Sequence, residues 1–154
     1  LLYKTKGMVP QGRYTVPIGQ AHIARSGTDI TIVATSIMVH KSLAAAEELA
    51  ASGISAEVID LRTIRPIDRD TILASVEKTS RLICVYEAVK TLGIGAEISA
   101  MVAESHAFDF LDAPIMRLGG SENPIPYNPE LEKASVPQIA DIIKNVTNLV
   151  KGKT

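Results

Sequence analysis

Four apolar runs, each followed by a polar turn and a helical stretch, constrain the fold of this 154-residue chain more than any other feature. Strands that alternate with helices are typical of a parallel sheet that carries helices on both faces. We therefore predict a three-layer α/β/α domain with right-handed crossovers between the parallel strands. The predicted strands of this kind are 30–34, 56–59, 82–86 and 114–118.

A fifth strand is predicted at 21–25, before the first of these runs. Only a few residues, Ser26 and Gly27 among them, separate it from the strand at 30–34. A crossover between adjacent parallel strands needs a dozen or more residues, so these two strands cannot be parallel neighbours. We predict an antiparallel edge strand in an otherwise mostly parallel sheet of about five strands.

The first 20 residues are rich in glycine and proline, which favours a linker or an extended arm packed on a neighbour. The α/β domain itself is predicted to span 21–150. The chain opens with Leu-Leu-Tyr-Lys rather than with Met. We expect a longer protein, in which an N-terminal domain precedes the arm at 1–20.

Local signals predict the helix boundaries. Asp68 is a good N-cap for a helix at 69–79, and Gly53 is suited to close a helix at 41–52. A further helix is expected after Gly93, and the last helix is expected to begin at a capping box, Ser135-Val136-Pro137-Gln138. The proline- and glycine-rich segment 119–129 is predicted to be a loop.

Composition excludes several classes of function. The net charge is −1 and the chain has no basic stripe, so we predict no nucleic-acid partner. The chain contains no apolar run near the ~20 residues that a membrane span needs. The single cysteine, Cys84, lies inside an apolar run and is predicted to be a buried thiol. Because one cysteine forms no internal disulfide, a reducing, cytoplasmic location is predicted.

Polar residues gather at or just after the predicted strand ends. In open α/β sheets ligands and partners meet the carboxyl ends of the strands, so these residues are the candidate site. Arg62 and Thr63 are an anion clamp in one interpretation; in the favoured one, Arg62 pairs with a nearby carboxylate. Glu87 is a helix cap, an ion-pair partner, a partner contact or an acid–base group. The candidate sheet-edge and interface residues are Ser36, His40, Arg62, Thr63, Glu87 and Arg117.

The motif Gly93-Ile94-Gly95 follows a strand and opens a helix, as in dinucleotide-binding folds, and Asp112 lies near the usual distance for a ribose-binding acid. Ile98 stands at the position of the third glycine of that motif. The turn between the strand and Gly93 is also longer than the tight turn that the motif needs. Close helix–sheet packing is the favoured interpretation. No pair of histidines has metal spacing, and Ser36 with His40 lacks a nucleophile elbow. The residues themselves therefore predict no catalytic, cofactor-binding or metal site.

Four segments of the sequence occur in a fixed order: 60–68, 85–88, 93–98 and 110–114. Together with Arg117 they resemble one family, the C-terminal domain of transketolase-like enzymes. More narrowly, they resemble the beta subunit of the thiamine-diphosphate-dependent decarboxylating component of 2-oxo acid dehydrogenase complexes. Pyruvate, branched-chain 2-oxo acid and acetoin dehydrogenases belong to that group. The resemblance runs from about Gly12 to about Ile143.

The resemblance implies an α2β2 assembly in which thiamine diphosphate and magnesium lie between the alpha subunit and the beta subunit's N-terminal domain. It implies that the C-terminal domain packs against a second beta subunit. It also implies that this domain helps to bind the subunit-binding domain of the dihydrolipoyl acyltransferase. No catalytic residue is carried over, and this chain alone is expected to bind no thiamine diphosphate and to have no activity.

Thr35-Ser36 and Leu92-Gly93 depart from the pattern of many relatives, and both changes leave the substrate open. The matching domain of a transketolase or of a deoxyxylulose-phosphate synthase is a second interpretation. A stand-alone doubly wound binding module is a third. We also predict that the chain forms a homodimer, with the loop at 119–130 and the strand-end residues as candidates for the partner-facing surface.

Overall fold

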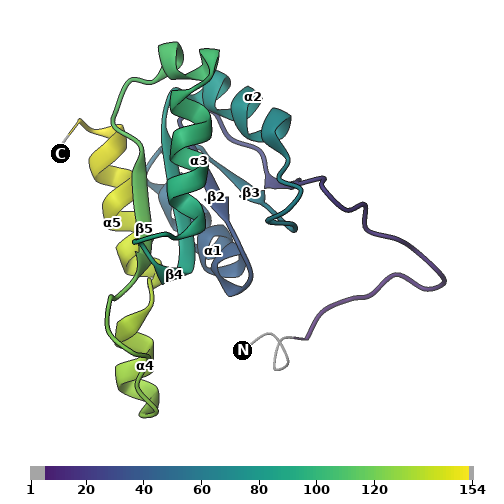
Figure 1. Cartoon of the computed structure of the whole chain (residues 1–154), viewed down its shortest axis with the longest axis vertical. Helices are drawn as coiled ribbons and strands as arrows, with labels where there is room; N and C mark the ends of the chain where they lie inside the picture. Colours follow the sequence, from purple (N-terminus) through teal and green to yellow (C-terminus); the bar gives the residue numbers. More distant parts are fainter. Residues whose placement is uncertain (1–5, 153–154) are drawn as a thin grey trace.

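A five-stranded sheet forms the centre of the computed structural model, which describes residues 6–152. The strand order is β1-β3-β2-β4-β5, and helices cover both faces of the sheet (Figure 1). This arrangement confirms the predicted three-layer α/β/α fold. The strands are β1 His22–Arg25, β2 Ile30–Ala34, β3 Ala56–Asp60, β4 Leu82–Val89 and β5 Met116–Gly120.

The strand β1 is antiparallel and lies at one edge of the sheet, as predicted. His22 pairs with Asp60 and Ile23 with Ile59, so β1 runs against β3. The pairs β2–β3, β2–β4 and β4–β5 are all parallel. Since β1 starts beside the end of β3, the segment that precedes β1 reaches the sheet at the carboxyl ends of the parallel strands.

Two separate apolar cores lie on the two faces of the sheet. In β2, Ile32 packs toward one core and Val33 toward the other, and Ile83 and Cys84 alternate in the same way in β4. Strands buried on both faces read as nearly continuous apolar runs, which is why the sequence showed them clearly. The helices α1 Ile37–Ala51 and α5 Ile139–Val150 cover the first core, and α2 Arg69–Thr79, α3 Ile94–Ala103 and the 3₁₀ segment η2 His106–Phe110 cover the second.

Caps fix several helix ends where the sequence predicted them. The Asp68 side chain accepts hydrogen bonds from the backbone N–H and the hydroxyl of Thr71, at 3.1 and 2.8 Å, and so begins α2. Gly53 follows the end of α1 with a φ of +77°, a conformation that suits glycine.

The predicted start of the last helix is wrong. The Ser135 hydroxyl donates to the carbonyl of Leu131 at 2.8 Å and so belongs to a separate helix, α4 Pro129–Ser135. Gln138 is the N-cap of α5 instead, and its backbone N–H donates to Asp141 at 2.9 Å. The predicted loop at 119–129 is also shorter than expected, because Gly119 and Gly120 extend β5 and Pro129 begins α4.

Two segments extend away from the body of the domain (Figure 1). Residues 6–18 form no helix or strand and are exposed. The segment that carries α4 extends beyond the end of β5. The domain boundaries predicted from the sequence stay a prediction. No helix within residues 6–152 has the length and apolar character needed to cross a membrane.

Candidate functional site

The order of the strands places a topological switch point between β2 and β4. From β2 the chain moves to β3 on one side, and it then returns to β4 on the other side. In open α/β sheets, ligands bind in the crevice outside the carboxyl ends of the strands at such a point. A cavity of about 680 Å³ lies there, lined by Thr35 after β2, by Tyr86 and Glu87 of β4, and by the start of α3.

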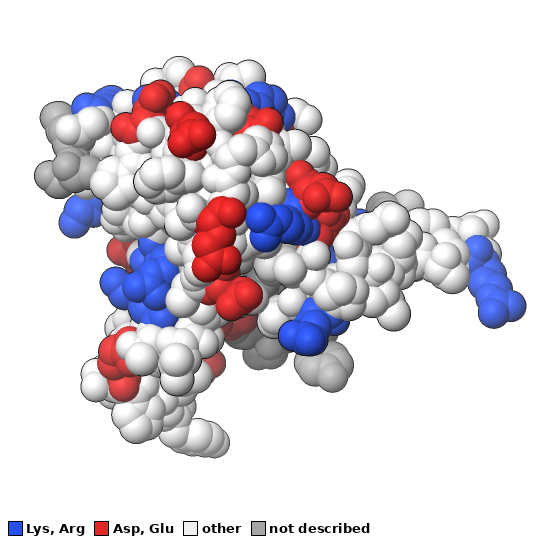
Figure 2. Space-filling model, turned by 45° about the horizontal axis from the view of Figure 1, so that its top comes forward, with Lys and Arg blue, Asp and Glu red and all other residues white. Residues whose placement is uncertain are grey.

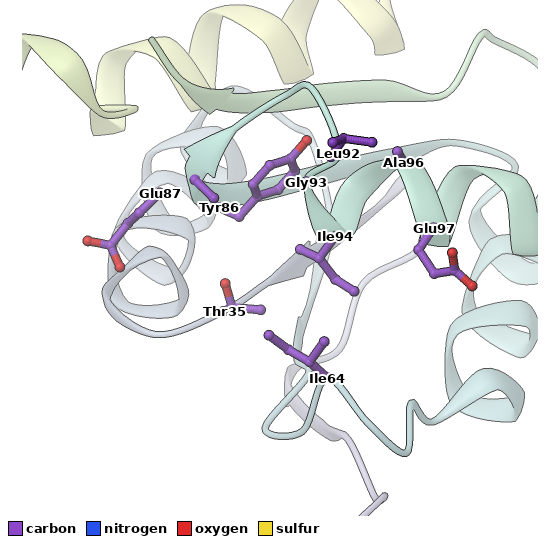
Figure 3. Close-up of a pocket in the computed structure, with 10 residues that line it drawn as sticks. Thr35, Ile64, Tyr86, Glu87, Leu92, Gly93, Ile94, Ala96 and Glu97 are labelled. Carbon is purple, nitrogen blue, oxygen red and sulfur yellow. The ribbon is translucent and has the colours of Figure 1, made fainter. Parts of the chain in front are cut away.

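We call this cavity the larger edge cavity, and Figure 3 shows how its side chains lie. Thr35, Ile64 and Ile94 converge on its centre, while Glu87 and Glu97 point outward at its two ends. The centre is therefore largely apolar, and the charged groups at its rim are carboxylates.

A smaller edge cavity of about 480 Å³ lies on the other side of Ile64, which lines both cavities together with Thr35. It brings together three predicted site residues, Ser36, His40 and Arg62. The Arg62 guanidinium lies 3.9 Å from the Asp60 carboxylate, which is one of the ion pairs expected for it. Within residues 6–152, no three histidine, cysteine or acidic side chains come together as a metal site.

Backbone strain is concentrated at this end of the sheet. Ser36, Arg62 and Leu92 have φ values of +54°, +56° and +58°, which non-glycine residues adopt at a cost. All three line one of the two edge cavities. Ser36 is the N-cap residue of α1, and its side chain makes no capping hydrogen bond to that helix.

Glu87 and Arg117 lie apart from the cluster around Ser36. Glu87 lines the larger cavity, whereas Arg117 of β5 donates to the carbonyl of Lys90 at 3.1 Å and holds the β4–α3 connection. The six predicted residues therefore form no single constellation.

The glycines of the motif Gly93-Ile94-Gly95 make room for a buried tyrosine. A Cβ on Gly93 would lie 2.4 Å from the carbonyl oxygen of Val89 and 2.8 Å from the Tyr86 ring, and a Cβ on Gly95 would lie 2.4 Å from that ring. The favoured interpretation of the motif, close helix–sheet packing, is confirmed.

The Tyr86 hydroxyl is buried and has no hydrogen-bond partner within the described part of the chain. Burial raises the pKa of this hydroxyl, and the positive charge of Arg117 opposes the shift.

Replacing Tyr86 with phenylalanine is expected to leave the free energy of unfolding unchanged or to raise it by up to about 1 kcal/mol. The substitution keeps the ring packing and removes a polar group that is buried without a partner. Urea unfolding of the two proteins measures the difference. A loss above about 1 kcal/mol in Tyr86→Phe would show that the hydroxyl has a stabilising partner.

Thr63 holds the segment that leads into β1. Its hydroxyl accepts a hydrogen bond from the Gly19 backbone N–H at 3.0 Å, and Asp68 accepts one from the Ala21 N–H at 2.8 Å. Burial tends to raise the pKa of Asp68, but the hydrogen bonds from Ala21 and Thr71 outweigh it and lower that pKa. The structure thus gives Thr63 an anchoring contact to the segment that leads into β1.

This lowered pKa predicts an acid-dependent loss of stability. Because the folded pKa of Asp68 lies below its unfolded value of about 4, the carboxylate stabilises the fold above that pH. The contribution disappears as the pH falls through the folded pKa. Unfolding free energies measured from pH 6 to pH 2 should therefore fall less steeply in Asp68→Asn than in the unchanged protein. Identical slopes would contradict this assignment.

Sequence reasoning missed a buried polar network at the other end of the sheet. Glu57 of β3 is fully buried; it accepts from the Ser75 hydroxyl at 2.6 Å and pairs with Lys78. The Thr31 hydroxyl bonds both Ser75 and Thr79, at 2.6 and 2.7 Å. The polar residues Ser75 and Thr79, spaced by four on the inner side of α2, were the available signal.

Sequence reasoning also missed an aromatic surface on η2. The chain has two phenylalanines, and both are about half exposed: Phe108 at 55% and Phe110 at 47%. Phe108 lines a cavity of about 590 Å³ together with Asp109 and Leu111. Phe110 and Leu111 belong to the segment 110–114, but the sequence gave no sign that the two phenylalanine rings face outward.

The family model for the C-terminal domain of transketolase matches residues 19–142. The chain is 54% identical over 130 residues to the pyruvate dehydrogenase E1 component subunit beta of Dictyostelium discoideum, covering 84% of this chain and 36% of that protein. It is 44% identical over 151 residues to the acetoin:2,6-dichlorophenolindophenol oxidoreductase subunit beta of Cupriavidus necator, covering 98% and 44%.

Among solved structures, a chain described as a split-gene transketolase in an inactive beta4 tetramer matches with a TM-score of 0.78 at 25% identity. The match covers 97% of this chain and 47% of that one. The chain thus spans less than half the length of the relatives described above. Since the family model covers most of the chain and the relatives match nearly all of it, this chain belongs to the transketolase C-terminal domain family.

Proposed function

We propose that this chain is the assembly and docking domain at the C-terminal end of a dehydrogenase beta subunit. The whole enzyme would decarboxylate a 2-oxo acid, or cleave acetoin, and transfer the acyl group to a lipoyl group. The observation that carries the proposal is the identity of 44–54% to pyruvate and acetoin dehydrogenase beta subunits over 84–98% of the chain. The identity to the transketolase structure is 25%, which makes the transketolase alternative weaker.

Thiamine diphosphate and magnesium are proposed to bind elsewhere in the whole enzyme. The residues of the larger edge cavity do not fit a diphosphate, because the charged groups that line it are the carboxylates of Glu87 and Glu97. The negative charges of these carboxylates would repel the negative charges of a diphosphate. We therefore assign no catalytic step to this chain, and its proposed partners are an alpha subunit, a second beta subunit and the acyltransferase core.

The η2 surface is the proposed docking face for the subunit-binding domain of the dihydrolipoyl acyltransferase. We define this face by Phe108, Phe110, Asp109 and the cavity that Phe108 lines. Half-exposed aromatic rings beside a hollow are typical anchors of protein interfaces. This end of the molecule is turned forward in Figure 2, where several carboxylates and some basic side chains stand among uncharged surface. Such a face suits a partner that presents apolar and basic side chains.

Replacing Phe108 and Phe110 together with alanine is expected to weaken docking at least tenfold, because the few central anchors of an interface contribute about 2 kcal/mol or more. Calorimetric titration with an isolated acyltransferase subunit-binding domain measures the change. Ile64→Ala is the matched control, since Ile64 is 60% exposed at the opposite end of the sheet. Unchanged affinity in the double variant, with a loss in Ile64→Ala, would place docking at the carboxyl edge instead.

The compartment is proposed to be a reducing one. Burial raises the pKa of the Cys84 thiol to about 12, so the thiol stays protonated and inert inside the sheet. The Dictyostelium relative is named as a mitochondrial protein, and the Cupriavidus relative carries no such name. A single buried thiol suits either the cytoplasm or the mitochondrial matrix.

A further inference from the structure

Two projections leave the domain at the same end, from opposite edges of the sheet. The first, which we call the arm, is residues 6–20; Thr63 and Asp68 hold its base beside the end of β3. The second, the α4 projection, is residues 121–135 and follows the end of β5. Figure 1 shows both extending away from the body of the domain. Neither projection packs on the two apolar cores along most of its length.

Both projections expose large apolar side chains. In the arm, Tyr14, Val16 and Ile18 are each more than half exposed and occupy alternate positions, so an extended chain presents them on one side. In the α4 projection, Tyr127 is fully exposed and Leu131 is more than half exposed. Apolar side chains grouped in this way on a monomer mark an interaction surface rather than ordinary scatter.

The two projections carry opposite charge. The arm contains Lys6 and Arg13 and no acidic residue, which gives a charge of +2. The α4 projection contains the three glutamates Glu122, Glu130 and Glu132 and one lysine, which gives −2. In Figure 2 the arm, at right, carries blue side chains, and the projection at lower left carries red ones. The projections therefore complement each other in both charge and apolar character.

Within one chain the arm and the α4 projection start far apart, and in Figure 1 the arm leaves the domain on the side away from α4. The arm starts beside β1 and β3, whereas the α4 projection starts at β5, and β1 and β5 are the opposite edges of the sheet. Four strand spacings amount to about 19 Å. The five residues from Gly19 to Tyr14 reach at most about 18 Å, so a contact within one chain would need the arm to run straight across the ends of the strands.

We infer that the arm of one chain packs on the α4 projection of a second copy, and that the second copy returns the same contact. A twofold axis generates both contacts at once, as in most homodimers. This inference rests on the proposed function in one respect, because a second beta subunit is already among the proposed partners. It adds the surfaces that meet: Tyr14, Val16 and Ile18 against Tyr127 and Leu131, with Lys6 and Arg13 near Glu130 and Glu132.

Two charge-reversed variants test the exchange. The first is Lys6→Glu with Arg13→Glu, and the second is Glu130→Lys with Glu132→Lys. In sedimentation velocity at micromolar concentration, the unchanged chain is expected to be a dimer and each variant alone a monomer. A 1:1 mixture is expected to form a heterodimer, because both of its contacts then join opposite charges.

The mixture also shows whether a variant is monomeric because the contact is repelled or because α4 has lost its structure. The circular dichroism spectrum of each variant should match that of the unchanged chain, since the altered side chains are exposed. A mixture that stays monomeric, or variants that stay dimeric alone, would overturn the inference. A monomeric unchanged chain would overturn it as well.

A disulfide trap gives an independent measurement. A chain that carries both Tyr14→Cys and Leu131→Cys should run as a covalent dimer after mild oxidation, since Cys84 is buried and takes no part. A monomer-sized oxidised product would mean that the arm folds back on its own chain, which contradicts the exchange. Titration of the same variants with the acyltransferase subunit-binding domain reports on the η2 surface, so failure of the exchange is distinguishable from failure of the proposed function.

Discussion

Gly27→Ala is expected to lower the free energy of unfolding by about 3 kcal/mol. A Cβ on Gly27 would lie 2.2 Å from the backbone carbon of Ala56 and 2.2 Å from the backbone nitrogen of Glu57. Those atoms belong to β3, which pairs with β2 on one side and β1 on the other. Overpacking a core costs typically 1–3 kcal/mol, and backbone atoms of a central strand give way less readily than side chains.

Urea unfolding followed by circular dichroism measures this effect, and Gly7→Ala is the matched control. A Cβ on Gly7 meets no heavy atom within 4 Å, so that substitution should change the free energy of unfolding by less than about 0.5 kcal/mol. Equal midpoints for the two variants would contradict the packing described here for the β1–β2 turn.

Glu57→Ala is the second large effect and is expected to cost about 2–4 kcal/mol. The carboxylate accepts hydrogen bonds from Ser75 and from the Gly27 backbone N–H, at 2.6 and 3.3 Å, and it pairs with Lys78. Truncation leaves a cavity, and it leaves buried donors without an acceptor. Thermal and urea unfolding both measure the loss.

Glu47→Ala is the control for this substitution, because Glu47 is an exposed glutamate of α1. Its effect should stay within about 0.5 kcal/mol. A comparable decrease in the free energy of unfolding in both variants would contradict a special contribution of the buried network, because an exposed glutamate would then matter as much as Glu57.

The sequence predicted the fold well where a local rule had one solution. The short connection after 21–25 excluded a parallel neighbour, and β1 is indeed antiparallel to β3. The Asp68 cap was readable because Pro66 blocks helix formation before it, and the N-cap hydrogen bond is present. Strands buried on both faces gave continuous apolar runs, so their existence was clear even where their ends were not.

The sequence failed where two neighbouring signals competed. Ser135 and Gln138 both suit a helix start, and only the tertiary structure decides that Ser135 ends α4 while Gln138 begins α5. Ser75 and Thr79 were a signal of buried polar groups on α2. The pairing with Glu57 was not readable, because Ser75 and Lys78 lie 18 and 21 residues from it. Pairing across such separations depends on the packing of α2 over the sheet.

The candidate site was only partly predictable. Ligand sites of open α/β sheets lie at the carboxyl ends of the strands, and this rule singled out Ser36, His40 and Arg62. The structure places all three in one cavity. It did not reveal that Thr63 binds the arm, because this depends on how the chain enters β1. The outward orientation of Phe108 was also hidden, since the sequence reports residue type but not exposure.

Calorimetric titration of this 154-residue chain with thiamine diphosphate and magnesium tests the division of labour most directly. No saturable heat is expected, because the larger edge cavity is lined by carboxylates and apolar groups that oppose a diphosphate. The same sample should still bind the acyltransferase subunit-binding domain, which shows that the chain is folded. Saturable one-to-one binding of the cofactor would mean that the sheet edge holds thiamine diphosphate, and it would contradict the assignment of this chain to assembly and docking.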